Sequence, residues 1–177
     1  MSEPEIFTAG HSNRAAAELV ELLVESSVSL VADVRRFPVS RRFPQHSRAP
    51  LTESLAAAGI GYEFLGDALG GRREPAPESS RNGAWRDPAL RAYADALATP
   101  ELEAGLAALG ALARTRLTAF LCAERDWRDC HRQILADVLV ARGWRVIHLI
   151  RPGEREAHRL HAAAHTCEGK VSYPSLL

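Results

Sequence analysis

Residues Val28-Ser29-Leu30-Val31-Ala32-Asp33-Val34 form the stretch of sequence that decides the predicted fold. Their β-branched and aliphatic side chains show no regular alternation with polar ones, a pattern typical of a strand that is covered on both faces. Strands of this kind belong to parallel sheets, because the helices that connect parallel strands cover both faces of the sheet. The segment therefore predicts an α/β fold.

Four further segments of similar character extend this prediction along the chain: Glu5–Ala9, Ile60–Leu65, Leu117–Cys122 and Trp144–Ile150. The segments between the strands are predicted as helices: Ser12–Ser26, capped by Ser12 or Asn13, then Thr52–Ala58, Pro88–Ala98, Glu101–Arg114 and Arg128–Ala141. Strands that alternate with helices predict a mostly parallel sheet with right-handed connections. We expect a three-layer α/β fold with about five strands flanked by helices.

Two regions depart from this alternation. Gly66–Asp87 contains glycine, proline and serine without periodicity, so we expect a long loop that is a candidate lid. Glu154–His165 is predicted as a terminal helix with His158, His161 and His165 on one face, followed by an extended tail at residues 171–177. Three histidines at this spacing can bind a metal ion, but a polar surface face is the simpler interpretation.

The bulk composition is that of an ordinary globular domain. The 177 residues are 46% apolar and 25% charged with a formal net charge of zero, so the whole molecule does not attract nucleic acid or membranes by its charge. We expect residues 1–177 to form a single domain. Lys170 is the only lysine. The remaining basic residues are arginines, which suit planar anion recognition.

The cysteine count and the first residues indicate the cellular compartment. An odd number of cysteines, three in all, argues against a disulfide framework. The first residues, MSEPEIFTAG, show no signal-peptide pattern, and no apolar run reaches transmembrane length. We therefore expect a cytoplasmic protein that has no membrane partner, and the sequence leaves its oligomeric state and its cofactors open.

Polar residues follow several of the predicted strands. Ligands of open α/β sheets bind outside the carboxyl ends of the strands, so these residues are expected to meet at one edge. His11 and Glu124 are the candidate catalytic residues for proton exchange, and Asp33 joins them as the partner that orients Arg35.

Gly10-His11-Ser12 stands between the first strand and the first helix. A glycine allows a tight turn, and the free amides at a helix N-terminus attract anions. Gly10 and Ser12 are therefore candidate substrate-binding residues, and His11 can exchange protons near neutral pH. The alternative interpretation is a capped helix with an incidental histidine.

The segment Arg35–Arg48 holds five arginines and no acidic residue. Arginine binds phosphate or carboxylate through two hydrogen bonds, and the aromatic residues of this segment can stack on bases. Arg35 is the strongest candidate because it directly follows a buried strand, and Arg41 is a second substrate-binding candidate. The alternative is a solvated basic loop.

Cys122, at the end of an apolar strand, and Arg128 have the spacing of a phosphatase-type phosphate loop. We reject this interpretation because the loop has no glycine and because Glu124 and Asp126 would repel a phosphate. Cys122 itself is expected to be a small buried packing residue, although a thiol beside a helix N-terminus can have a lowered pKa. Glu124 is either an ion-pair partner or a general acid or base.

Cys130-His131-Arg132 begins the next predicted helix and supplies further candidate substrate-binding residues. A metal site built from Cys122, Cys130 and His131 is an alternative. Its spacing matches no standard zinc motif, and two adjacent ligands are awkward to place on one ion, so no metal is assigned.

Taken together, these motifs resemble the Domain of Unknown Function 488 family: Thr8-x-Gly10-His11-Ser12, Asp33-Val34-Arg35-x-x-Pro38-x-Ser40, Leu65-Gly66, Leu121-Cys122-x-Glu124, Cys130-His131-Arg132 and His148. The resemblance spans nearly the whole chain and departs from the family in the loop Gly66–Asp87. It implies a cytoplasmic α/β domain of bacteria or archaea and no established reaction. It also implies that the candidate residues act as one set: His11, Asp33, Arg35, Cys122, Glu124, Cys130, His131 and Arg132.

The leading functional hypothesis is a protein that binds a phosphate-bearing ligand, either a nucleotide or a nucleic acid, at the strand edge. Acid/base hydrolysis of that ligand by His11 and Glu124 is its catalytic form, and whether the protein is an enzyme stays open. One alternative is a binding module for nucleic acid or protein with a continuous basic surface around Arg35–Arg48. The other alternative is the metal site described above.

Overall fold

Two neighbouring parallel strands, β2 (Leu30–Asp33) and β4 (Thr118–Cys122), lie inside the sheet, and Ala32 lies opposite Phe120. The computed structural model describes residues 3–75 and 80–175 of the chain. All nine residues of the two strands are buried, as the absence of a regular alternation with polar residues predicted.

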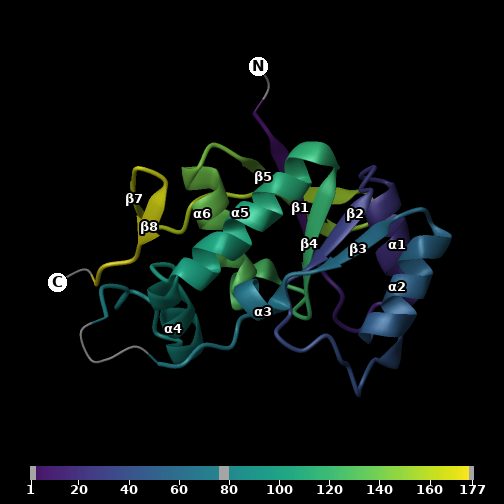
Figure 1. Ribbon diagram of the computed structural model, residues 1–177, viewed down its shortest axis with the longest axis horizontal. Helices are drawn as coiled ribbons and strands as arrows, with labels where there is room; N and C mark the ends of the chain where they lie inside the picture. The colour runs from purple at the N-terminus through teal and green to yellow at the C-terminus, as the bar shows by residue number, and fades with distance from the viewer. Residues whose placement is uncertain (1–2, 76–79, 176–177) are drawn as a thin grey trace.

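The main sheet has six strands in the order β3-β2-β4-β1-β5-β6 (Figure 1). The other four strands are β1 (Glu5–Gly10), β3 (Gly61–Phe64), β5 (Arg145–Arg151) and β6 (Glu154–Ala157). Every pairing in it is parallel except that of β5 with β6. The prediction of a mostly parallel α/β sheet is therefore confirmed.

Helices cover the two faces of the sheet in two groups. One group contains α1 (Ala16–Val24) and α2 (Arg48–Ala57). The other contains α3 (Gly66–Leu69), α4 (Pro88–Ala96), α5 (Pro100–Thr115) and α6 (Arg132–Ala141). Alternate strand residues serve the two faces: Ala119 and Leu121 pack with α1 and α2, whereas Phe120 packs with α5 and α6. Each face thus has its own apolar core.

The predicted terminal helix Glu154–His165 is wrong. The chain turns at Pro152-Gly153, where Gly153 has φ of 77°, and returns as β6 along the open edge of β5. A hairpin of β7 (His165–Cys167) and β8 (Lys170–Ser172) follows. Pairing with the free backbone groups of β5 outweighs the local helical pattern, so no helix face gathers the three histidines.

Helix boundaries also differ from the prediction. The first helix, α1, begins at Ala16 with Ala15 at its N-cap position, so the expected cap by Ser12 or Asn13 is wrong. A 3₁₀ turn at Trp127–Asp129 (η2) delays the start of α6 to Arg132, and a second one at Pro44–His46 (η1) leads into α2 at Arg48. The predicted loop Gly66–Asp87 contains the short helix α3, and residues 76–79 of that loop lie outside the described part of the chain. Within residues 3–75 and 80–175, no helix is long and apolar enough to cross a membrane.

The connections that leave the sheet create the space for a site. The chain leaves β1 and β2 toward α1 and α2 on one face, whereas it leaves β4 toward α6 on the other face (Figure 1). Connections that diverge in this way open a crevice at the carboxyl ends of neighbouring strands. The carboxyl end of β4 is therefore the place where the fold itself predicts a ligand site.

Candidate functional site

A cavity of about 430 Å³ opens at the carboxyl end of β4. We call it the strand-edge cavity, and its lining residues come from the ends of β1, β2 and β4 and from the segments that follow β2, α3 and η2: His11, Arg35, Arg36, Phe37, Val39, Ser40, Gly71, Arg72, Cys122, Ala123, Glu124 and His131. Five residues of the predicted set are among them, so the strand ends do bring these side chains together.

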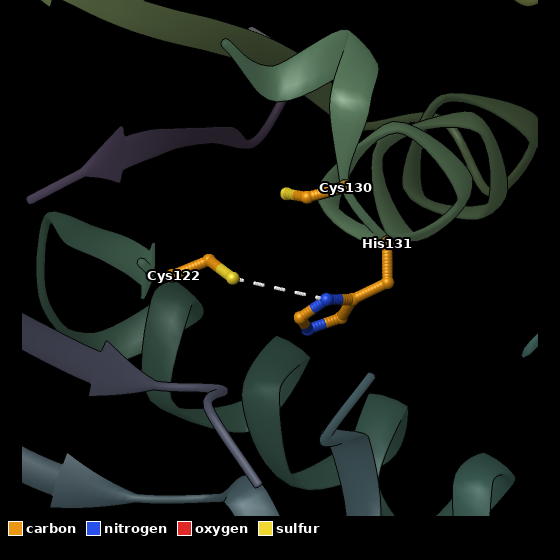
Figure 2. Close-up of side chains that lie close together, drawn as sticks. All are labelled: Cys122, Cys130 and His131. Carbon is orange, nitrogen blue, oxygen red and sulfur yellow. Dashed lines mark hydrogen bonds between the residues drawn. The ribbon is translucent and has the colours of Figure 1, made fainter. Parts of the chain in front are cut away.

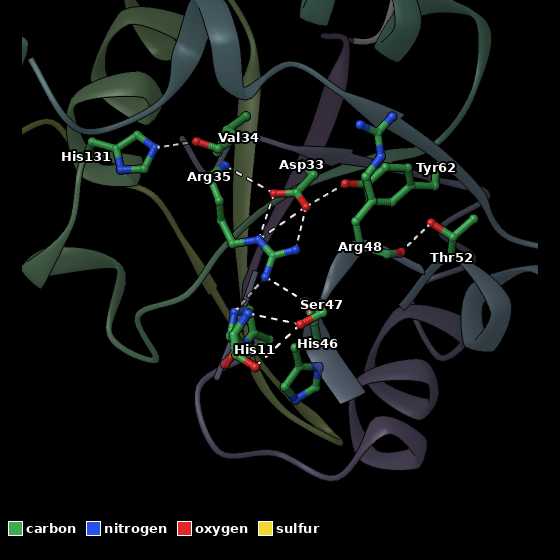
Figure 3. Close-up of polar contacts among 11 residues, drawn as sticks. His11, Asp33, Val34, Arg35, His46, Ser47, Arg48, Thr52, Tyr62 and His131 are labelled. Atoms are coloured by element: carbon green, nitrogen blue, oxygen red, sulfur yellow. Dashed lines mark hydrogen bonds and ion pairs between the residues drawn. The ribbon is translucent and has the colours of Figure 1, made fainter. Parts of the chain in front are cut away.

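Arg35 is held from behind by a buried carboxylate (Figure 3). Its Nη2 lies 2.6 Å from Oδ2 of Asp33, and its Nε donates to both carboxylate oxygens. Asp33 also accepts a hydrogen bond of 2.7 Å from the hydroxyl of Tyr62. Asp33 is fully buried and does not line the strand-edge cavity, so its place is that of a partner that orients Arg35.

His11 is neutral, and its tautomer follows from its two contacts. Ser12 can only accept through its carbonyl oxygen, so Nδ1 of His11 carries the proton in this 3.0 Å hydrogen bond. Nε2 then accepts from Nη1 of Arg35 at 3.1 Å. Burial lowers the pKa of His11 to about 4. The basic nitrogen of His11 is therefore already occupied by Arg35.

His46 completes the support of these two side chains. Its carbonyl oxygen accepts from Nη1 of Arg35 at 2.7 Å, and its ring lies against the ring of His11 with centroids 4.4 Å apart. Its Nε2 donates to the carbonyl oxygen of Arg14. Burial lowers the pKa of His46 as well, so this histidine is a neutral structural residue.

Cys122, Cys130 and His131 form a second group of side chains, which we call the sulfur–imidazole cluster (Figure 2). Their ligand atoms all lie within 4.8 Å of one another, and all three residues are buried. Sγ of Cys122 is 3.8 Å from Nδ1 of His131. A hydrogen bond from Cys130 and the charge of Arg132 lower the pKa of Cys122 to about 7, against the opposing effect of burial. Burial raises the pKa of Cys130.

Arg132 lies beneath the site and is only 1% exposed. It donates through Nε to Sγ of Cys130 at 3.2 Å and through Nη1 to the hydroxyl of Thr8 at 3.2 Å. Its Nη2 donates to the backbone carbonyls of Glu124 and Arg125. Arg132 therefore fixes the loop after β4 and does not line the strand-edge cavity.

The remaining predicted residues take other places. Gly10 and Ser12 lie beside the cavity rather than on its wall. Gly10 is required by packing, because a Cβ at this position would lie 1.8 Å from the carbonyl oxygen of Glu124. Arg41 is exposed and lies outside the cavity lining. Glu124 lies at the rim, and the described residues make no hydrogen bond or ion pair with its carboxylate.

The sequence pattern singled out neither Arg36 nor Arg72 as a residue of the cavity wall, whereas the aromatic rings of Arg35–Arg48, Phe37 among them, were expected to stack on bases. Arg36 and Arg72 add two guanidinium groups, and Phe37 adds an aromatic ring that is 62% exposed. The guanidinium of Arg72 lies over the ring of Phe37, 5.7 Å from its centroid. The adjacent arginines at positions 35 and 36 are a sequence signal that could have indicated Arg36. No sequence signal indicates Arg72, because nothing in the sequence places the loop after α3 beside β2.

Two alternative interpretations can be compared with these positions. The phosphate-loop arginine, Arg128, points away and pairs with Glu156 at 2.6 Å, so it does not enclose a site around Cys122. The basic-surface hypothesis expected outward arginines along Arg35–Arg48. Arg35 instead turns inward onto Asp33, while Arg41 and Arg42 are exposed.

A larger cavity of about 880 Å³ lies elsewhere, between α4, α5, α6 and the β7–β8 hairpin. None of the predicted site residues lines it, and its wall contains apolar residues such as Leu97, Leu106 and Val138. It lies away from the carboxyl ends of β1, β2 and β4. The smaller cavity, which collects the polar residues of three strand ends, is therefore the candidate functional site.

Comparison with protein-family models matches residues 15–139 to the family described as Domain of unknown function DUF488. The matched segment includes Asp33, Arg35 and the whole sulfur–imidazole cluster, whereas Gly10, His11 and Ser12 precede it. No curated protein matches the chain, and no solved structure matches it.

Proposed function

The chain belongs to the Domain of unknown function DUF488 family, whose description names no reaction, and we propose from its own geometry that it binds a phosphate-bearing ligand in the strand-edge cavity. A nucleotide or a segment of nucleic acid is the expected ligand. The proposal rests on one observation: three guanidinium groups line a single cavity of about 430 Å³ together with one carboxylate.

The charge of this lining favours an anion. Arg35, Arg36 and Arg72 are permanently cationic, whereas the pKa values of His11 and His131 are lowered by burial, so both imidazoles are neutral near pH 7. Glu124 supplies the opposing charge from the rim. Guanidinium groups bind phosphate oxygens through paired hydrogen bonds, and a partly enclosed cavity strengthens such contacts by excluding water.

The three arginines contribute in different ways. Most N–H groups of Arg35 are used by Asp33, by the carbonyl of His46 and by His11, so this side chain supplies a fixed positive field. Within residues 3–75 and 80–175, the side chain of Arg36 makes one hydrogen bond, of 2.6 Å to the carbonyl of Asp67, and Arg72 is exposed. In this part of the chain, Arg36 and Arg72 therefore have N–H groups left that would contact the phosphate.

An exposed aromatic wall favours a nucleotide over inorganic phosphate. Phe37 and Val39 line the cavity although they are 62% and 68% exposed. A base that stacks on an aromatic side chain gains about 1–3 kcal/mol without sequence preference. The combination of arginines with an exposed aromatic ring, over which the guanidinium of Arg72 lies, supports a ligand that carries both a phosphate and a base.

A thermal-shift experiment with inorganic phosphate, ATP and short oligonucleotides tests the binding proposal, because a ligand that binds only the folded state raises Tm. We expect ATP or an oligonucleotide to stabilise the wild-type protein. Removing Arg36 or Arg72 should weaken binding about tenfold each, the effect of one charged hydrogen bond. These two are preferable to Arg35→Ala, which would leave Asp33 buried without its partner.

The matched control is the pair Arg41→Ala and Arg42→Ala, which removes two exposed arginines of the same segment that lie outside the cavity. This pair should keep the full stabilisation by ligand. If the control variants lost as much of the stabilisation by ligand as the Arg36 and Arg72 variants, the ligand would bind at the exposed basic loop, and the binding-module hypothesis would be favoured. The absence of any shift with phosphate, ATP and oligonucleotides would contradict the proposal itself.

The catalytic form of the proposal assigns proton exchange to Glu124. Nε2 of His11 is occupied by Arg35, whereas the carboxylate of Glu124 lies free at the rim among the described residues. Release of p-nitrophenol from p-nitrophenyl phosphate provides the assay. Glu124→Gln should lower this rate by about 100-fold while leaving ligand binding intact, the usual loss when a general acid or base is removed. An unchanged rate would remove Glu124 from the chemistry.

A further inference from the structure

The sulfur–imidazole cluster has no part in the proposed phosphate contacts, yet it places three metal-ligating atoms around one point. Sγ of Cys122, Sγ of Cys130 and Nδ1 of His131 all lie within 4.8 Å of one another (Figure 2). A tetrahedral zinc ion has bonds of about 2.3 Å to sulfur and about 2.0 Å to nitrogen, so ligand atoms around zinc are themselves separated by between 3 and 4 Å. The 3.8 Å separation between Cys122 and His131 is already in this range.

The backbone explains how two adjacent residues can face one ion. Cys130 is extended, with φ of −143° and ψ of 169°, whereas His131 is helical, with φ of −58° and ψ of −13°. The chain turns between them into α6, so both side chains approach Cys122 from the same side, as Figure 2 shows. The objection that the sequence raised against adjacent ligands therefore does not apply to this conformation.

The orientation of His131 is that of a metal ligand. Its Nε2 lies 3.0 Å from the carbonyl oxygen of Val34, which can only accept, so Nε2 carries the proton. Nδ1 then keeps its lone pair and lies 3.8 Å from Sγ of Cys122. Histidines that bind metals almost always donate their other N–H to a carbonyl or carboxylate in this way, which fixes both tautomer and ring orientation.

Arg132 supplies hydrogen-bond donors to the sulfur of Cys130. The backbone N–H and the Nε–H of Arg132 point at Sγ of Cys130, at 3.4 and 3.2 Å. The guanidinium of Arg132 is 1% exposed, so its charge is little screened by water. Hydrogen bonds to coordinating groups are part of the second shell that tunes a metal site.

The ligand set also indicates which ion fits. Two thiolates and one neutral imidazole are soft and borderline ligands, which favour zinc over magnesium or calcium. Two thiolates neutralise the charge of a divalent zinc ion, which lowers the cost of placing it among buried arginines. Three protein ligands leave a fourth position open, as in catalytic rather than structural zinc sites. Cys122 and His131 also line the strand-edge cavity, so this open position would be near it.

We propose that Cys122, Cys130 and His131 bind one zinc ion at the wall of the strand-edge cavity. This site is independent of the phosphate contacts, because none of its ligands is an arginine and none of the arginines is a ligand.

The test measures metal in the full-length protein. The protein is stripped with a chelator, reloaded with Zn²⁺ and desalted, and bound zinc is determined by elemental analysis. In parallel, the stripped protein is titrated with Co²⁺, which reports tetrahedral thiolate ligation through sulfur-to-cobalt charge-transfer absorption and visible bands. The variants are Cys122→Ala, Cys130→Ala and His131→Ala, with circular dichroism as the check on folding. Cys167→Ala is the matched control, because Cys167 is exposed on β7.

We expect one zinc ion per chain in the wild-type protein and in Cys167→Ala, and loss of zinc in each of the three cluster variants. The Co²⁺ spectrum of the wild-type protein should show both signatures, and this result does not depend on how well the variants fold. Zinc below half an equivalent, a cobalt spectrum without the charge-transfer band, or zinc that the cluster variants retain would overturn the proposal. The proposal is also overturned if freshly purified protein contains a disulfide between Cys122 and Cys130 and takes up no zinc after that disulfide has been reduced.

Discussion

At the residue scale, the site depends on a buried ion pair that fixes one guanidinium. Asp33 and Arg35 are 0% and 4% exposed, and the carboxylate meets the guanidinium through three contacts of 2.6 to 3.2 Å. A buried pair of this kind contributes little net stability, but removing one partner leaves an uncompensated charge. The pair therefore defines where Arg35 points, and the protein depends on keeping both members.

Asp33→Asn tests this dependence. The charge of Arg35 would stay buried without its counterion, so we expect the free energy of unfolding to fall by about 3–5 kcal/mol, measured by urea denaturation. Glu154→Gln, which removes one member of the exposed pair of Arg151 and Glu154, should change it by no more than about 0.5 kcal/mol. A loss below about 1 kcal/mol for Asp33→Asn would show that water reaches Arg35.

At the element scale, the loop that follows β4 lies directly against the end of β1. The carbonyl oxygen of Glu124 would be 1.8 Å from a Cβ at position 10, and the guanidinium nitrogen of Arg132 would be 2.9 Å from it. Glycine is therefore fixed at the end of β1 by an element more than a hundred residues away in the sequence. This contact holds the carboxyl ends of β1 and β4 together and so shapes the cavity.

Gly10→Ala should shift the backbone of this loop. Overpacking of this kind costs about 1–3 kcal/mol, and we expect a matching decrease in the urea midpoint together with a weaker thermal shift by ATP. Gly110→Ala is the control, because the nearest atom to its Cβ would be 3.4 Å away, at the end of the flexible side chain of Arg114. Within α5 this change should stabilise the protein by up to about 1 kcal/mol. Equal effects of the two substitutions would contradict the packing argument.

At the scale of the whole molecule, a chain of buried hydrogen bonds connects the site to the C-terminal segment. Arg132 donates to the hydroxyl of Thr8, and contacts of 2.9, 2.9 and 2.8 Å then join Thr8 to His148, His148 to His158, and His158 to Asp137, whose carboxylate accepts. Tyr173 donates to the other oxygen of Asp137 at 2.7 Å. The chain thereby joins α6, β1, β5 and the C-terminal segment, all of which support Arg132 beneath the cavity.

This network predicts how stability depends on pH. Burial lowers the pKa of His148 to about 2, and the groups that face it are His158, Arg132, Arg128, Thr8 and the stacked ring of Trp127. A histidine with a depressed pKa stabilises the folded state fully above its unfolded pKa of about 6.5 and loses this contribution as the pH falls from there toward the folded value. Each such histidine gives the free energy of unfolding a slope of about 1.4 kcal/mol per pH unit within that window.

His148→Gln should therefore reduce the slope between pH 6 and pH 5 by about 1.4 kcal/mol per unit, although the variant is less stable at pH 8. Glutamine can still accept a hydrogen bond from Thr8 and donate one to His158, so the main effect of the substitution is the loss of a titratable group. Urea denaturation at a series of pH values measures the slope. The exposed His165→Gln should leave it unchanged, and an unchanged slope for His148→Gln would mean that His148 is charged in the folded protein.

The sequence by itself determined the layered α/β fold and the edge at which polar residues gather. Apolar periodicity is a local property of the sequence. Neighbouring residues alone therefore predicted the buried strand at Leu30–Asp33 and the helices on either side of it. Because parallel strands end at the same edge, the positions of His11, Arg35 and Glu124 around one cavity followed from strand ends without knowledge of the strand order.

Only the tertiary structure decided what the side chains at that edge contact. Arg35 turns onto Asp33, Arg72 arrives from a loop beyond α3, and Cys130 and His131 meet Cys122 because an extended residue precedes a helical one. β6 forms where a helix was predicted because the open edge of β5 lies beside it. Side-chain direction and strand pairing depend on groups distant in the sequence, so local patterns cannot specify them. The sequence therefore specifies the edge of the sheet at which the candidate residues lie, whereas the tertiary packing specifies the contacts that their side chains make there.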